Sequence, residues 1–252
     1  IGFCLVGSEM CIRDRDDTPA AVAGEARARS IDAGLRIYMT KVYNYMAMGL
    51  LVTAAAAYFG ATSGIYLAIA STPLIYVLAF APLVMAIWLG SRLHAMSSAR
   101  AQTMFWVFAG LMGMSLSYVL LVFTGVSVVR TLLVTAGSFG ALSLYGYTTK
   151  RDLAPMGAFL FMGLIGIILA SIVNIFVGSS ALHMTVSVLG VLIFAGLTAY
   201  DTQDIKRIYY AGDTSEIAEK KAIYGALRLY LDFINLFIIC LLYTSPSPRD
   251  RS

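Results

Sequence analysis

The chain has 252 residues, of which 59% are hydrophobic and only 13% are charged. Soluble globular domains carry about 25% charged residues, so the composition excludes that class and favours a membrane protein. The net charge of +4 is small for this length and gives no indication of a nucleic-acid partner.

Apolar runs long enough to cross a bilayer recur along the chain. Each holds about 17–23 residues, and a rise of about 1.5 Å per residue carries such a run through roughly 30 Å of hydrocarbon. The predicted spans are residues 42–59, 72–90, 103–124, 131–147, 156–178, 181–200 and 223–243. We therefore expect an all-α membrane protein with a seven-helix transmembrane domain over residues 37–239.

Lysine and arginine fall on alternate connections between these spans. On one side of the membrane the only lysine or arginine is Arg130, in the connections 60–71, 125–130 and 178–181. The basic residues on the other side are Arg27, Arg29, Arg36, Lys41, Arg92, Arg100, Lys150, Arg151, Lys206, Arg207, Lys220 and Lys221. Because basic residues are retained on the cytoplasmic side, we expect the N-terminal tail, residues 16–36, to be cytoplasmic.

The two ends of the chain differ in character from its middle. All three cysteines lie there, at Cys4, Cys11 and Cys240. Residues 1–15 and 240–252 resemble translated sequencing adapter, and the closing Pro/Ser/Arg tail has no hydrophobic periodicity. We interpret both as non-native segments and give them no functional role.

The longest polar connection covers residues 201–222. It is predicted to continue the sixth helix by a turn, break near Gly212 and restart from a cap at Thr214 or Ser215. The seventh helix then begins in the cytosol, before it enters the membrane.

One face of the seventh predicted helix is polar. Its polar residues recur at steps of three or four, which places them on one side of an α-helix. They are Lys221, Tyr224, Arg228, Asp232 and Asn235. A polar stripe at membrane depth is tolerated only against protein or water. Arg228 and Asp232, four residues apart, could pair with each other and serve only to help this helix insert.

Asp232 is the only carboxylate placed well inside a predicted span, and Asp201 ends the preceding span on the same side of the membrane. If the two carboxylates meet, they cannot both ionise easily and will titrate as a unit. An ionised pair attracts hard divalent cations, so protons and Ca²⁺ would compete for the same oxygens. The two histidines, His94 and His183, are too far apart in sequence to predict a metal cofactor.

Four stretches of the sequence resemble the bacterial branch of the Bax inhibitor-1 family. They are KVYNYMA (41–47), FGALSLYGYTTKRDL (139–153), GLTAYDTQDIK (196–206) and LRLYLDFINLF (227–237). The resemblance implies a seven-helix bundle with the seventh helix at its centre. It also implies a pH-sensitive Ca²⁺ leak channel of the inner membrane, gated by protonation of an aspartate dyad that maps onto Asp201 and Asp232. A basic residue at the end of the second helix would latch onto the helix-six aspartate, and Arg92 is the nearest candidate.

Two other functions remain open at this point. An intramembrane aspartyl protease also uses two membrane aspartates, but such proteases carry a GxGD pattern where this chain has Leu229-Tyr230-Leu231-Asp232. A non-conducting interaction protein, modulating a membrane protease or a stress response, is excluded by no feature of the sequence. We expect no enzyme activity and no cofactor, and as partners the lipid bilayer, Ca²⁺ and protons, with a membrane protease as partner in the last alternative.

Overall fold

A computed structural model describes the backbone of residues 19–244 and the side chains of residues 31–93 and 95–242. The described part consists of helices and short connections, without a strand. The helices are α1 (Pro19–Thr62), α2 (Ile65–Ala70), α3 (Leu74–Arg92), η1 (Leu93–Ala95), α4 (Ser98–Ser115), α5 (Ser117–Val122), α6 (Gly125–Thr148), α7 (Ala154–Val177), α8 (Ser180–Ile208) and α9 (Ser215–Thr244). Of the two predicted non-native segments, residues 1–15 and 245–252 lie outside the described residues, and residues 240–244 form the end of α9.

Within the described residues, seven helical stretches are long and apolar enough to cross a membrane. The predicted seven-span, all-α architecture is therefore confirmed. The first stretch starts earlier than expected, at Ile31, because α1 continues as one helix from the predicted tail into the membrane. The third stretch, Ser98–Val122, is interrupted at Leu116, where the backbone leaves helical geometry between α4 and α5.

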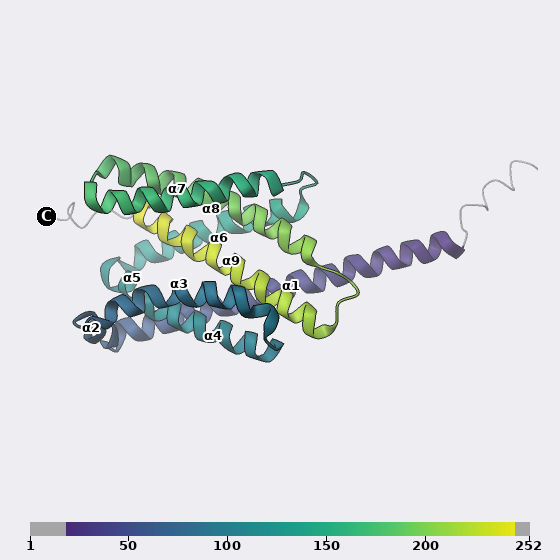
Figure 1. Ribbon diagram of the computed structural model, residues 1–252, viewed down its shortest axis with the longest axis horizontal. Coiled ribbons are helices and arrows are strands. Elements are labelled where there is room, and N and C mark those ends of the chain that lie inside the picture. Colours follow the sequence, from purple (N-terminus) through teal and green to yellow (C-terminus); the bar gives the residue numbers. More distant parts are fainter. Residues whose placement is uncertain (1–18, 245–252) are drawn as a thin grey trace, which may run out of the picture.

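The seventh span, α9, lies at the centre of the bundle (Figure 1). It contacts α8, α1, α6 and α4, whereas α7 packs mainly on α8 and α3 mainly on α4. In the most apolar part of each span, 61% of the residues of α9 are buried, compared with none of α7. A helix surrounded by protein can carry polar groups that lipid would not tolerate, so the central position is what permits the polar stripe on α9.

The packing core joins α1, α4 and α9 through Tyr230. This side chain is fully buried, and its ring meets those of Phe105 and Phe108 edge to face at 6.1 and 5.5 Å between centroids. Its hydroxyl lies 2.6 Å from that of Thr53 on α1, which in turn reaches the carbonyl of Ala109 on α4 at 3.0 Å. A hydroxyl network of this kind satisfies the polar end of a ring that otherwise packs as an apolar residue.

Two glycines let pairs of spans approach closely. A side chain on Gly113 of α4 would collide with the carbonyl of Thr53 on α1, and one on Gly146 of α6 with the carbonyl of Ala199 on α8. Small residues at such crossings allow close van der Waals packing, which holds membrane helices together where no hydrophobic driving force acts between them.

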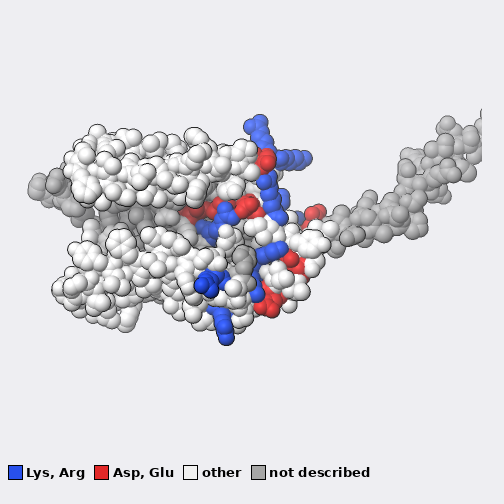
Figure 2. Space-filling model, viewed as in Figure 1, with Lys and Arg blue, Asp and Glu red and all other residues white. Residues whose placement is uncertain are grey.

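The charged side chains gather at one end of the bundle, around the connection between α8 and α9 (Figure 2). Lys221 stabilises that connection by donating to Asp213 at 2.5 Å and to the carbonyl of Ile208 at 3.0 Å. The predicted helix restart is confirmed, since α9 begins at Ser215 and the Thr214 hydroxyl accepts from the backbone N–H of Ile217.

Candidate functional site

The structure brings the two predicted aspartates together. Asp201 lies almost two turns before the end of α8, and Asp232 lies in the middle of α9. Both line the same cavity, described below, and the two residues are only 7% and 6% exposed. α8 and α9 run side by side in the bundle, which brings the two positions to the same cavity (Figure 1).

Arg228 joins α9 to α8 through two carboxylates. Its Nε and Nη2 donate to both oxygens of Asp201, at 3.1 and 2.5 Å, and its Nη1 donates to Asp204. A bidentate guanidinium–carboxylate pair is among the stronger charge-assisted contacts. The pairing of Arg228 with Asp232 along α9, which the sequence left open, is not formed.

Asp204 was missed by the sequence interpretation. It stands three residues after Asp201, so both side chains lie on the same face of α8. The spacing therefore indicated two carboxylates on one face of α8, but only the position of Arg228 shows that Asp204 accepts a hydrogen bond from it.

Asp232 differs from the other two carboxylates in its hydrogen bonding. Its Oδ2 is fully buried and has no hydrogen-bond partner among the described residues. A buried acceptor without a partner costs about 1–3 kcal/mol, and more when it is charged. The position therefore favours a hydrogen-bond donor or a cation.

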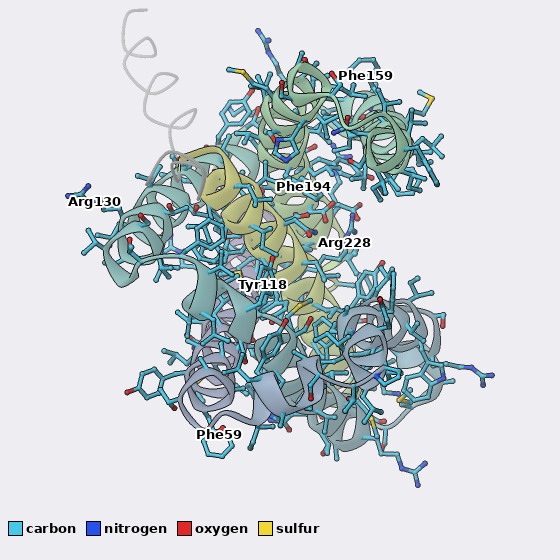
Figure 3. All side chains as sticks on the ribbon, turned by 90° about the vertical axis from the view of Figure 1, so that its left-hand side faces the viewer. Phe59, Tyr118, Arg130, Phe159, Phe194 and Arg228 are labelled. Atoms are coloured by element: carbon cyan, nitrogen blue, oxygen red, sulfur yellow. The ribbon has the colours of Figure 1, made fainter. Side chains whose placement is uncertain are left out.

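The aspartates line a cavity of about 550 Å³ between α7, α8 and α9. Polar groups from α8 and α9 form one side, and small or apolar residues of α7 form the other. The lining residues are Ala154, Gly157, Ala158, Phe161, Leu164, Phe194, Leu197, Tyr200, Asp201, Arg228, Leu231, Asp232 and Asn235. Figure 2 shows charged groups deep in the hollow between the α7–α8 part and the α3–α4 part, and in Figure 3 Arg228 points from α9 into this space.

Two tyrosines flank the guanidinium of Arg228. Its central carbon lies 5.9 Å from the ring centroid of Tyr200 and 5.8 Å from that of Tyr224. A cation within about 6 Å of an aromatic face is attracted by the ring quadrupole. Of the predicted polar stripe, Tyr224 thus supports Arg228 and Asn235 lines the cavity, whereas Lys221 serves the connection described above.

The predicted latch on Arg92 is not present in this structure. Arg92 lies exposed at the end of α3 and forms no ion pair with a described residue. The helix-six aspartate is instead bound by Arg228. The physical reason is the packing order: α3 packs on α4, away from α8, whereas α9 contacts α8 along its length.

No group of three or more histidine, cysteine, aspartate or glutamate side chains is arranged to hold a metal ion in the part of the chain that the structure describes. Calcium binding by Asp201 and Asp232 therefore remains a prediction. It would depend on two carboxylates, of which one is already engaged by Arg228.

Comparison with known families bears on this arrangement. The family model described as inhibitor of apoptosis-promoting Bax1 matches residues 35–244. The chain belongs to the Bax inhibitor-1 family. An uncharacterized protein of Rickettsia prowazekii is 48% identical over 84% of this chain and 91% of its own length. Inner membrane protein YbhL of Escherichia coli is 45% identical over 83% of this chain and 91% of its own length. An uncharacterized membrane protein of Streptococcus pyogenes is 34% identical over 82% of this chain and 91% of its own length.

Two of the stretches that resemble the Bax inhibitor-1 family contact each other at the charged end. Gln203 donates to the carbonyl of Arg151 at 2.8 Å and accepts from the backbone N–H of Leu153 at 2.9 Å. Arg207 pairs with Asp152 at 2.7 Å. The backbone N–H of Ala154 and the Arg207 guanidinium hold the pKa of Asp152 below its ordinary value. The two bonds of the buried Gln203 fix the connection between α6 and α7 onto α8, directly beside the cavity, whereas the exposed Asp152–Arg207 pair adds little.

Proposed function

We propose that this protein is a pH-sensitive leak channel for Ca²⁺ or similar cations in the inner membrane, with Asp201 and Asp232 as its ion and proton site. The inner membrane is proposed because YbhL, a close relative, is named for that membrane. A cytoplasmic N-terminus is proposed because the basic residues gather on alternate connections.

The observation that carries the proposal is that two buried aspartates line one cavity between helices long and apolar enough to cross a membrane. Ionisable groups in a membrane protein are costly and usually mark an ion or proton pathway. Calcium prefers oxygen ligands, which two carboxylates and the amide of Asn235 can supply.

Arg228 supplies the link between protons and conduction. With Asp201 ionised, the guanidinium stays on α8 and closes the polar side of the cavity. A proton on Asp201 removes the charge that holds Arg228 there. The side chain can then move towards Asp204 alone, and a cation gains access to the dyad. Under this mechanism the flux is larger at pH 6 than at pH 8.

The proposal is tested by Ca²⁺ entry into proteoliposomes that contain the full chain, at pH 6 and pH 8. Asp201→Asn and Asp232→Asn are each expected to abolish the flux or to remove its dependence on pH. The matched control is Asp152→Asn, at an exposed carboxylate on the same end of the bundle. Because the pKa of Asp152 is lowered, that group stays ionised at both pH values and its replacement should change neither flux nor pH response.

If the folded protein gives no flux above that of empty liposomes, the channel interpretation is wrong. The non-conducting alternative, a modulator of a membrane protease or of a stress response, would then be preferred. In that case Asp232→Asn should leave the cellular role unchanged.

A further inference from the structure

The cavity beside the aspartates is amphipathic in a way that a cation path alone does not require. Its α7 side is apolar over three turns, formed by Ala154, Ala158, Phe161 and neighbouring residues, and these three are exposed. Its opposite side carries carboxylates and Asn235. A volume of about 550 Å³ lies within the range of small-molecule sites, roughly 300–1,000 Å³.

The polar side contains one acceptor that the protein does not use. Asp232 is 6% exposed, lines the cavity, and its Oδ2 has no hydrogen-bond partner among the described residues. Arg228 cannot serve it from its present position, because the guanidinium nitrogens that bond are directed to Asp201 and Asp204. Asp201 and Asp204 therefore share the one guanidinium, and the oxygen left without a partner belongs to a residue that lines the cavity.

These features match a ligand with a cationic hydrogen-bond donor at one end and an apolar body at the other. We propose that the cavity binds hydrophobic primary amines, with the ammonium group donating to Asp232 and the alkyl chain lying along the apolar face of α7. An amine of this kind can enter from the bilayer past Ala158 and Phe161, because both lie at the exposed edge of the cavity. Binding of this class goes beyond ion transport and does not depend on it.

The binding test uses octylamine with the full-length purified protein in detergent, and follows thermal stabilisation against ligand concentration. Octylamine is cationic at pH 7.5, as an alkyl ammonium group similar to that of lysine. Octanol, of equal chain length, measures partition of an uncharged amphiphile into the micelle and the protein. We expect saturable stabilisation by octylamine and at least tenfold weaker binding of octanol.

Two variants locate the site independently. Asp232→Asn keeps the shape of the side chain and removes its charge, and should weaken octylamine binding at least tenfold. Ala158→Phe fills the α7 side without touching any carboxylate and should weaken it by a similar factor. Ala158 is exposed, so this change is not expected to unfold the protein. The matched control, Ala141→Phe on the exposed face of α6, should bind within twofold of the unaltered chain.

Equal stabilisation by octanol and octylamine would overturn the proposal, because binding would then be partition of the alkyl chain. Unchanged affinity in either Asp232→Asn or Ala158→Phe would also overturn it, since the amine would be bound elsewhere. The assay involves no ion gradient. A chain that binds amines and conducts no Ca²⁺ would therefore refute the proposed channel and leave this site standing.

Discussion

Arg228→Met is the substitution that tests the described site most directly. It keeps much of the side-chain volume and removes the guanidinium that bonds Asp201 and Asp204. Breaking a fully buried ion pair costs about 3–5 kcal/mol, because the remaining charge stays buried without a partner. An exposed pair is worth about 0–1 kcal/mol. The Arg228 side chain is 22% exposed, that of Asp201 10% and that of Asp204 32%, so we expect a loss of about 2–4 kcal/mol between these limits.

The loss is measured as a decrease in the thermal unfolding midpoint of the purified protein, expected at about 5–15 °C for a chain of this size. Arg228→Lys should give an intermediate decrease, because it keeps the charge and loses the fork that meets Asp201 with two bonds. The control is Arg207→Met, which breaks the exposed pair with Asp152 and should change the midpoint little. If Arg228→Met lowers the midpoint no more than Arg207→Met does, the carboxylate cluster on α8 does not depend on Arg228 and the described site is wrong.

Three further predictions follow from the packing. Tyr230→Phe removes the hydroxyl that bonds Thr53 and should destabilise the protein by about 1–2 kcal/mol in a denaturant or thermal titration; an unchanged midpoint would contradict the hydroxyl network. Gly146→Ala should lower the thermal midpoint because the added methyl group meets the backbone of α8, whereas Gly140→Ala, which faces open space, should be neutral; equal effects would argue against close contact of α6 and α8. Phe194→Ala removes a buried ring that lines the cavity and, under the proposed channel function, should raise Ca²⁺ flux at pH 8; a flux no different from the unaltered chain would show that this ring does not obstruct the passage of ions.

The spans were predictable because each is an apolar run whose length is set by the bilayer, a property that a single sequence displays. The break at Leu116 falls between Ser115 and Ser117, but serine is common where membrane helices pack together, so this pair did not predict a break. The bond between Thr53 and Tyr230 joins residues 177 positions apart and leaves no local signal. Such contacts follow from helix packing, which the apolar pattern of a membrane helix specifies poorly because all its faces are apolar.

Only part of the candidate site could be predicted from the sequence, because helical spacing is a local signal and helix packing is not. The depth of Asp232 and its side of α9 come from helical spacing, but whether it lies beside Asp201 stayed open, because that depends on how α8 and α9 are aligned. The partner of Arg228 could not be predicted. Spacing along α9 suggested Asp232, and only the packing of α8 on α9 brings Asp201 and Asp204 to the guanidinium instead. Arg92 was assigned from the family resemblance, and its latch is not formed in this structure, where α3 packs mainly on α4; the role stays a prediction.

The geometry makes the two aspartates of the dyad inequivalent. Asp201 gives both oxygens to Arg228, so a proton or a cation that reaches it must compete with a guanidinium tethered at its side. Asp232 has an oxygen without any partner in the described protein, so a cation meets no such competitor there. Under the proposed channel function, Asp201 is therefore the group through which protons act on the closed state, and Asp232 is the first ligand of the entering ion. On this division of roles, Asp201→Asn should chiefly alter the response to pH, and Asp232→Asn should chiefly alter the conducted current, because only the first change loosens Arg228.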